Sequence, residues 1–356
     1  MTRYEIRHRA GAIPADAPQP AADGLATPLA TGEAWSCYHG TEGARSHLPI
    51  DDLKRAIASG TGTLWVDIDN RKPEEVALLT DLFGFHPLAI EDSLNPDSRV
   101  KIEEYNGYLI LVVRTVDFIH ETEDPYDIDT VNLTCFLGKN YLVTVHGADS
   151  NPVQATVALL ERKPELAAAG PARLMHAVVD EAVNAYFPIL DQLDLFMDSL
   201  EERVFAQFDQ GALREIFSVK RLVLSLRRHL APQRDVFGIL TNRPSTLLSL
   251  DTQIYFRDIH DHVLRINDAL ETYRELLSNT LDSYLTQVSN RLGTVTKALS
   301  AVATVSIPFV VVSGMWGMNF DKIPLAHSAY GFWTMLAVQL GLGFLLLAVL
   351  RWRKLL

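Results

Sequence analysis

Hydrophobic and polar positions follow two different periods along the chain. Four segments are apolar or alternate with a period of two, as strands do: residues 63–68, 108–118, 131–136 and 141–146. Residues 137–140 supply a hairpin turn between the last two. Pro73, followed by two acidic residues, predicts a helix that runs to about Phe83. Strands alternating with helices indicate an α+β domain, in which a mixed sheet is covered by helices.

From about Pro171 the apolar spacing becomes helical. Residues 172–205 and 212–240 predict an antiparallel helix pair with a break near residues 209–211, and a long helix follows residues 242–245. Its apolar positions recur in steps of four and three, as in a coiled-coil seam: Ile259, Val263, Ile266, Leu270, Tyr273, Leu277, Leu281, Tyr284, Val288, Leu292, Val295 and Leu299. Gly293 offers the alternative of two helices, but one glycine costs only about 1 kcal/mol in a helix. We therefore expect a continuous rod of about 55 to 60 residues.

Two uncharged runs follow, over residues 298–316 and 331–350. Each has the roughly 20 residues that cross a bilayer core of about 30 Å. Buried core helices are the alternative, but nothing polar in the sequence would cover two such runs in tandem. The N-terminus has no apolar signal segment, and Arg351, Arg353 and Lys354 follow the second run. The positive-inside rule then predicts that both termini are cytosolic.

Composition and motif content argue against several classes of function. The net charge of −12 argues against a nucleic-acid partner and is compatible with cations. Cys37 and Cys135, the only cysteines, suit packing in a reducing compartment. The α/β region has no phosphate loop, nucleophile elbow or cluster of metal ligands, so an enzyme is not expected. Residues 10–32 are rich in Ala, Pro and Gly and indicate a loose leader.

The first uncharged run carries a second stripe, dominated by small or hydroxyl-bearing residues: Gly293, Thr296, Ser300, Ala303, Ile307, Val310 and Gly314. Such residues mark a face turned away from lipid tails. Two helices cannot enclose a pore, so this stripe predicts either a conduit shared by several subunits or a helix-dimer seam. No Asp, Glu, Lys or Arg lies in the membrane interior, which disfavours a proton-coupled carrier.

Short motifs along nearly the whole chain resemble one known family. Gly317, Met318 and Asn319, between two C-terminal spans and after a long stalk helix, resemble the signature of CorA-type divalent-cation channels. Residues 85–101, 136–146 and 255–262 resemble further motifs of that family, in the same order. The resemblance implies a funnel-shaped homopentamer in the cell inner membrane, with two transmembrane helices per subunit. It also implies passive conduction of Mg²⁺, often with Co²⁺ or Ni²⁺.

The same resemblance assigns roles to individual residues. Asn319 would form a ring of neutral oxygen acceptors that meets hydrated Mg²⁺, Gly317 would allow a tight turn, and Met318 would pack that turn. Asp92 and Asp258 would bind a regulatory Mg²⁺ across a subunit boundary, although plain surface acids are the alternative. Two carboxylates about 5 Å apart repel by roughly 3 kcal/mol, which a bound cation would cancel.

The chain also departs from the family pattern. Residues 323–326 lack the acid that commonly follows the signature, and the family alignment favours Leu299 over Ser300 as the constricting residue. Gly293, Thr296 and Ile307 replace residues that are common on the pore face. These changes admit a ZntB-like Zn²⁺ transporter, and a membrane-anchored sensor without transport is a further alternative. Asp258 and His262, spaced i and i+4, are able to chelate one ion, whereas His260 and His262 point apart.

The predicted organisation has six segments. They are a cytosolic α/β domain at 1–170, a cytosolic helix pair at 171–245, a stalk at 246–316 that includes a transmembrane helix from about 296, an external loop at 317–330, a second transmembrane helix at 331–350 and a basic tail at 351–356.

Overall fold

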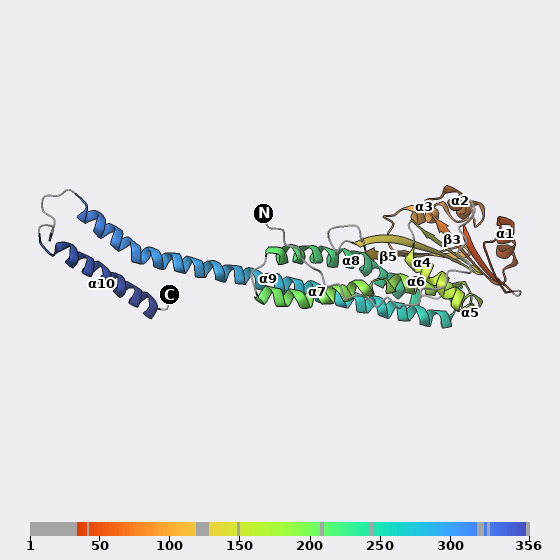
Figure 1. The fold of residues 1–356 in the computed structure, drawn as a ribbon. Coiled ribbons are helices and arrows are strands. Elements are labelled where there is room, and N and C mark those ends of the chain that lie inside the picture. Colours follow the sequence, from red (N-terminus) through yellow and green to blue (C-terminus); the bar gives the residue numbers. More distant parts are fainter. Residues whose placement is uncertain are drawn as a thin grey trace, which may run out of the picture.

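The computed structural model describes residues 34–40, 43–118, 128–147, 150–206, 210–242, 245–318, 324–325 and 328–353. A mixed sheet with helical cover is joined to a long helical stalk, and a shorter apolar helix returns beside the end of the stalk (Figure 1). The expected fold class is thus confirmed for one subunit. The predicted leader at residues 10–32 lies outside the described residues.

The sheet has seven strands in the spatial order β2-β1-β3-β7-β6-β5-β4. Their bounds are β1 Trp35–Gly40, β2 Gly43–Ser46, β3 Thr63–Asp69, β4 Lys101–Tyr105, β5 Tyr108–Phe118, β6 Ile128–Gly138 and β7 Tyr141–His146. β3 and β7 are parallel, whereas the other neighbours are antiparallel. The β6–β7 hairpin is confirmed, but its turn is shorter than predicted because Leu137 still pairs with Leu142.

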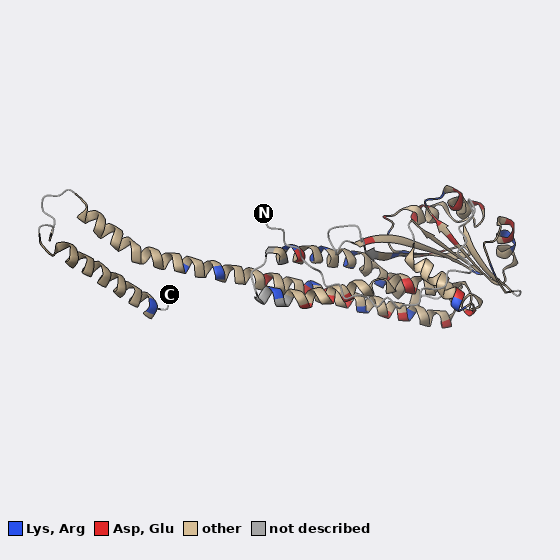
Figure 2. Cartoon of the chain, viewed as in Figure 1, with Lys and Arg blue, Asp and Glu red and all other residues tan. Residues whose placement is uncertain are grey.

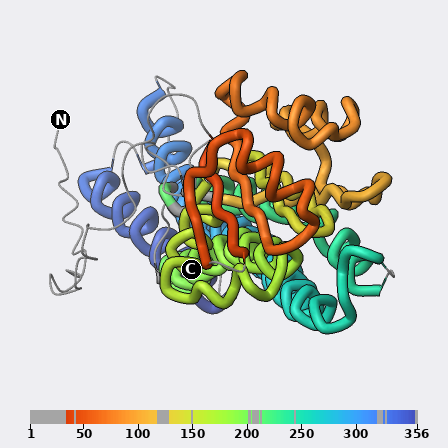
Figure 3. The backbone as a smooth tube through the Cα atoms, turned by 90° about the vertical axis from the view of Figure 1, so that its right-hand side faces the viewer, coloured from red at the N-terminus to blue at the C-terminus, as the bar shows by residue number. Residues whose placement is uncertain are grey.

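Alternate residues of β5 serve two hydrophobic cores. Leu109 and Leu111 face the core that contains the long helices, whereas Ile110 and Val112 face a second core on the other side. Three helices cover the second side: α1 Ile50–Ser59, α2 Pro73–Asp81 and α3 Pro87–Leu94. α4 Asn151–Arg162, α5 Glu165–Ala168 and α6 Pro171–Asn184 lie on the first side. Figure 3 shows α2 and α3 across the sheet from α4 to α6.

Both cysteines are buried in the first core, as the packing interpretation expects. Burial raises the pKa of the Cys37 thiol and raises that of Cys135 to about 12. Both thiols therefore stay protonated and unreactive near neutral pH.

The single helix predicted over residues 172–205 is wrong. The structure has two helices there, α6 and α7 Phe187–Ala206, with Tyr186 in the break. Pro188 explains the break, because proline has no N–H and its ring clashes with the carbonyl of residue 184 in a continuous helix. The next helix, α8 Gln210–Asn242, begins near the predicted break at 209–211, of which residue 209 lies outside the described residues.

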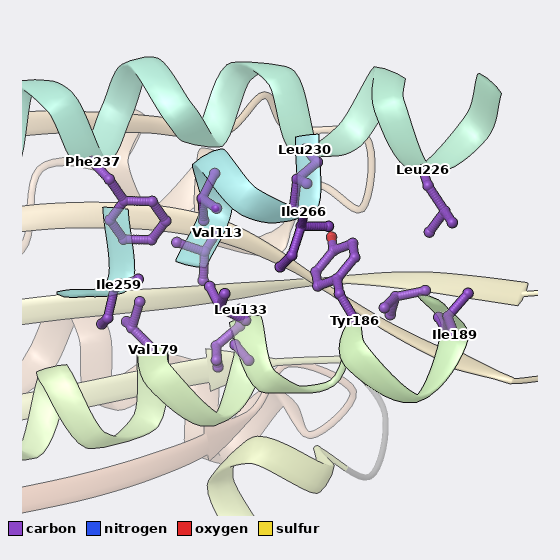
Figure 4. Packing of buried hydrophobic residues seen from close by; sticks show 14 of the residues in the cluster. Val113, Leu133, Val179, Tyr186, Ile189, Leu226, Leu230, Phe237, Ile259 and Ile266 are labelled. Atoms are coloured by element: carbon purple, nitrogen blue, oxygen red, sulfur yellow. The ribbon is translucent and has the colours of Figure 1, made fainter. Parts of the chain in front are cut away.

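The stalk helix α9 spans Leu250–Trp316 without interruption and has 67 residues, or roughly 100 Å. It begins at Ser249, whose hydroxyl accepts a hydrogen bond from the backbone N–H of Thr252 at 3.2 Å. The predicted apolar seam from Ile259 to Leu277 is buried, but it packs against helices of the same chain. Figure 4 shows Ile259 and Ile266 among Phe237 and Leu230 of α8 and side chains of α6, α7 and the sheet. The returning helix, α10, spans Gly331–Trp352.

Candidate ion pathway and regulatory carboxylates

The far half of the stalk has the composition of a membrane span. α9 and α10 are the two described helices long and apolar enough to cross a bilayer. Between residues 298 and 316 of α9 there is no charged side chain, and Arg351 is the first in α10. Figure 2 shows the same division, because the acidic residues of the described chain lie on the sheet, on the helices packed around it and on the near half of the stalk.

α10 packs on one side of α9. Ala301 is buried there, and Val305, Pro308, Val312 and Trp316 are half-buried. Gln339 of α10 donates a hydrogen bond to the Ser313 hydroxyl at 3.2 Å. Gly343 lies against the ring of Phe309, so closely that a Cβ atom at Gly343 would be 2.6 Å from Cζ.

The predicted stripe lies on the other side of α9. All seven of its members are exposed in the single chain: Gly293, Thr296, Ser300, Ala303, Ile307, Val310 and Gly314. At about 100° per residue, their mean direction is roughly 160° from the side that α10 covers. The stripe is therefore available to other copies of the chain. Leu299 is also 66% exposed, so a single chain does not separate it from Ser300 as a constricting residue.

The signature motif begins where α9 ends. The backbone N–H of Gly317 donates to the Ser313 carbonyl at 3.0 Å, and that of Met318 donates to the Met315 carbonyl at 3.4 Å. Both residues lie at the end of the stalk farthest from the sheet (Figure 1). Asn319, the predicted oxygen donor, lies outside the described residues.

Asp92 lies near the C-terminal end of α3 and has partners within its own chain. Its carboxylate accepts hydrogen bonds from the Ser98 hydroxyl at 3.2 Å and from the Lys101 ammonium at 2.5 Å. Burial, the largest single influence, lowers the pKa of Lys101, but hydrogen bonds to Asp92 and Glu103 outweigh it and raise the pKa overall. Because Lys101 is a cation, it already neutralises part of the charge that would repel a second carboxylate.

Asp258 lies near the start of α9, and its side chain is 69% exposed. Its carboxylate is 3.8 Å from Nε2 of His262, and Nδ1 of His262 is 3.9 Å from the Asp180 carboxylate. These distances are too long for hydrogen bonds. The described residues contain no group of three or more His, Cys, Asp or Glu side chains that would hold a metal ion. A site at Asp258 therefore needs ligands from elsewhere.

The structure does not bring Asp92 and Asp258 together in one chain, because α3, which carries Asp92, covers the second side of the sheet, whereas α9, which carries Asp258, packs in the core on the first side. Each has an exposed apolar side chain one helical turn before it. Leu88 precedes Asp92 and is 58% exposed, and Ile254 precedes Asp258 and is 60% exposed. Sequence reasoning missed these two residues, although the i, i+4 spacing was available. Both faces are therefore open to contact with another copy of the chain.

A sequence pattern built for one family of proteins matches most of this chain. The pattern describes the CorA-like Mg²⁺ transporter protein and matches residues 60–353. This chain belongs to the CorA-like Mg²⁺ transporter family. The matched range contains every predicted site residue, from Asp92 to Asn319. Residues 1–59, which include β1, β2 and α1, precede it.

Individual CorA relatives agree with this assignment. The cobalt/magnesium transport protein CorA of Thermotoga maritima is 29% identical over 84% of this chain and 83% of its own length. The solved structure of the CorA magnesium transporter from Methanocaldococcus jannaschii is similar with a TM-score of 0.78 and 21% identity, covering 91% of this chain and 98% of that one. The ZntB cytoplasmic domain of Vibrio parahaemolyticus is similar with a TM-score of 0.60 and 15% identity, covering 73% of this chain and 99% of that domain. These two structural similarities show a shared fold.

Proposed function

We propose that this CorA-like chain forms a homopentameric channel for Mg²⁺, with Co²⁺ and Ni²⁺ as further cargo. The observation that carries the proposal is the stripe from Gly293 to Gly314, which is exposed on the side of α9 away from α10. Copies arranged about an axis would turn these stripes inward and place α10 outside, toward lipid. The apolar positions Leu292 and Val295 on the stalk, 62% and 52% exposed in one chain, would then be covered by neighbouring subunits.

The chemistry of the pathway fits a hydrated cation. Mg²⁺ releases water slowly and is met well by neutral oxygen acceptors at a wide radius. An Asn319 amide from each subunit would supply such acceptors at the outer mouth. Small and hydroxyl-bearing side chains along the stripe leave room for the hydration shell, and no fixed charge in the span traps the ion. The channel would act by passive conduction and not as an enzyme.

Regulation by cytosolic Mg²⁺ would use Asp92 of one subunit and Asp258 of the next. Carboxylate oxygens are the ligands that Mg²⁺ prefers, and the exposed neighbours Leu88 and Ile254 support a subunit contact at these positions. Since Lys101 already binds Asp92, an incoming cation has to reach that carboxylate through water or displace the ammonium group. Loss of the bound cations would weaken the subunit contact and favour opening.

The proposed location is the cell inner membrane, with 296–316 and 331–350 as the spanning segments and both termini cytosolic. Arg351 and Arg353 at the end of α10 support this orientation by the positive-inside rule. Zn²⁺ transport is the second candidate, because residues 323–326 lack the acid common in the family and the fold is shared with a ZntB domain.

Ion flux into liposomes that contain the full-length protein tests the proposal. We expect Mg²⁺ and Co²⁺ to enter without a proton gradient, and the substitution Asn319→Ala to remove most of that flux. Zn²⁺ flux that depends on a proton gradient would support the ZntB-like function instead. Absence of flux for all three ions would support a sensor whose helices only anchor it. Replacing both Asp92 and Asp258 with Asn should weaken inhibition by Mg²⁺ on the cytosolic side, and unchanged inhibition would contradict the regulatory site.

A further inference from the structure

A buried asparagine on the sheet holds the loop that follows Asp92. The side-chain amide of Asn132, on β6, donates to three backbone carbonyls, those of Asn95 at 3.1 Å, Pro96 at 3.0 Å and Ser98 at 3.2 Å. Asn132 is only 8% exposed. One side chain thus binds three carbonyls of a loop that has no strand or helix of its own.

Arg114, on the adjacent strand β5, fixes Asn132 and binds the same loop. Its Nε donates to Oδ1 of Asn132 at 2.9 Å, and its Nη2 donates to the Pro96 carbonyl at 2.7 Å. The side-chain oxygen and the nitrogen of Asn132 therefore each have a defined partner. This pairing fixes the orientation in which the amide N–H groups point at the loop.

The long helices support Arg114 in turn. Its backbone carbonyl accepts hydrogen bonds from Tyr186 at 2.8 Å and from the fully buried Gln233 of α8 at 3.2 Å. Nη1 of Arg114 is 3.4 Å from Nδ1 of His229 on α8. Burial lowers the pKa of His229, and the charge of Arg114 lowers it further, so the neutral ring is able to accept this bond. The support for the loop extends from the sheet to the helix that packs on α9.

The other end of the loop touches Asp92 directly. Ser98, whose carbonyl is held by Asn132, donates its hydroxyl to Asp92, and Lys101 follows three residues later. Of the two side-chain partners that Asp92 has in the described part of the chain, Ser98 thus lies on the loop that Asn132 and Arg114 hold, whereas Lys101 is held by the pairing of β4 with β5. Neither Asn132 nor Arg114 touches Asp92, and they are positioning residues for it.

We infer that Asn132, held by Arg114, sets the affinity of Asp92 for the regulatory cation by fixing the loop of residues 95–98. The inference rests on the proposed regulation at Asp92 and Asp258 and adds the residues that prepare it. A carboxylate held in place before binding loses less conformational freedom when the cation arrives. Without the Asn132 amide, the Ser98 carbonyl loses its donor, and the Asn95 and Pro96 carbonyls keep only the Ser98 N–H and Arg114. Ser98 is then held less firmly beside Asp92.

The test uses the full-length protein in liposomes and compares Asn132→Leu with Asn140→Leu. Asn140 is a matched control, because it is 6% exposed, lies in the turn between β6 and β7 and donates to one backbone carbonyl, that of Ala56 on α1 and not of the loop. We expect Asn132→Leu to raise the Mg²⁺ concentration for half-maximal inhibition by roughly tenfold, because a buried carbonyl left without its donor loosens the loop beside Asp92. Asn140→Leu should leave that concentration within about twofold of the original.

A double-mutant cycle and hydrogen exchange show whether Asn132 acts through Asp92. Once Asp92→Asn has been made, adding Asn132→Leu should produce no further shift in inhibition. Amide exchange of Asn95, Asp97 and Ser98 should become faster in Asn132→Leu and not in Asn140→Leu. Equal shifts from both Asn→Leu changes, additive effects in the cycle, or unchanged exchange would each overturn the inference. The exchange measurement tests the inference even if the protein transports no ion. Absence of flux in the unsubstituted protein would contradict the proposed function and would leave the exchange result as a separate test.

Discussion

The two halves of α9 have the same apolar spacing and opposite surroundings. In the near half, Leu270 and Leu277 are fully buried by helices of their own chain. In the far half, Leu292 and Leu299 continue the same steps of three and four but are 62% and 66% exposed. The near half of this uninterrupted helix is therefore part of the hydrophobic core of a subunit. Most of the surface of the far half is exposed among the described residues.

A heptad-like pattern therefore specifies which residues of a helix form an apolar seam, but not which helix packs against that seam. Near the sheet, polar contacts fix the partner as well, because the Tyr273 hydroxyl donates to Asp194 of α7 at 2.6 Å and Arg227 of α8 forms an ion pair with Glu271. Beyond Val288, which still packs against the first core, α10 is the partner in the described part of the chain, and it covers one side. The remaining sides of the far half are left for lipid and further copies.

Replacing matched leucines in the two halves should give the largest effect. Leu270→Ala removes a fully buried side chain and should lower the free energy of unfolding by about 2 to 5 kcal/mol. Leu292→Ala should cost a single subunit much less and should instead weaken assembly. Thermal unfolding and particle mass of the detergent-solubilised protein measure both quantities. A greater loss of subunit stability from Leu292→Ala than from Leu270→Ala would contradict the view that the near half, and not the far half, is part of the subunit core.

The near half should also respond to acid, because His176 of α6 contacts its first turns. The ring lies 5.4 Å from Tyr255 and 5.6 Å from Phe256. Burial, followed by the charge of Arg173, lowers the pKa of His176 from 6.5 to about 4, and the nearby Asp258 opposes that shift only in part. Between these pH values the unfolded chain binds more protons than the folded one. Stability is therefore complete above about pH 6.5 and falls as the pH decreases toward 4.

We expect the full-length protein to lose about 2 kcal/mol of unfolding free energy between pH 7.5 and about pH 5 through this histidine. His176→Asn should flatten the dependence in that window. His260→Asn, at the start of the same α9 helix, keeps His176 and should retain the slope. Denaturant unfolding at the two pH values provides the measurement. If the free energy of unfolding changed equally with pH in all three proteins, His176 would not be the cause of the pH dependence.

The comparison also explains what sequence reasoning found in the fold. The apolar run of β5 was visible because residues on both of its faces pack into a core, and the seam of α9 was visible because every third and fourth residue faces one. Strand β4 was missed because Lys101–Tyr105, at the edge of the sheet, is polar and only half-buried. The break before α7 was missed although Pro188 signals it, because the apolar period continues on both sides.

Sequence reasoning also found the candidate site residues that depend on neighbours along the chain and missed those that depend on distant contacts. Asp92, Asp258 and the stripe on α9 were found from motifs and helical spacing, which involve neighbours along the chain. The contacts of Asn132 with the loop at 95–98 join segments more than 30 residues apart. Only the pairing of β5 with β6 brings Arg114 opposite Asn132, and no local pattern contains that information.

Thiol labelling should separate two sides of the far half. Ala303→Cys lies on the exposed stripe and Val305→Cys on the side that α10 partly covers. We expect a charged, water-soluble thiol reagent to modify position 303 at least about tenfold faster than position 305 and to reduce Mg²⁺ flux. Cys37 and Cys135 should contribute little background because both are buried with raised pKa values. Equal labelling rates at the two positions would contradict the proposal that the stripe lines a water-filled pathway.

The smallest expected effect concerns the one side of the far half that has a partner in its own chain. Gly343→Val would push against the Phe309 ring, since even a Cβ atom would lie 2.6 Å from Cζ. Gly341→Val, two residues away, meets no atom within 4 Å. We expect the first change to destabilise packing of α10 on α9 by about 1 kcal/mol, because the flexible ring is able to move, and the second to be nearly neutral. Thermal unfolding of the two variants in the same detergent measures the difference. Equal losses would mean that close approach at Gly343 does not hold the two helices together, so that the far half of α9 would depend on other subunits on every side.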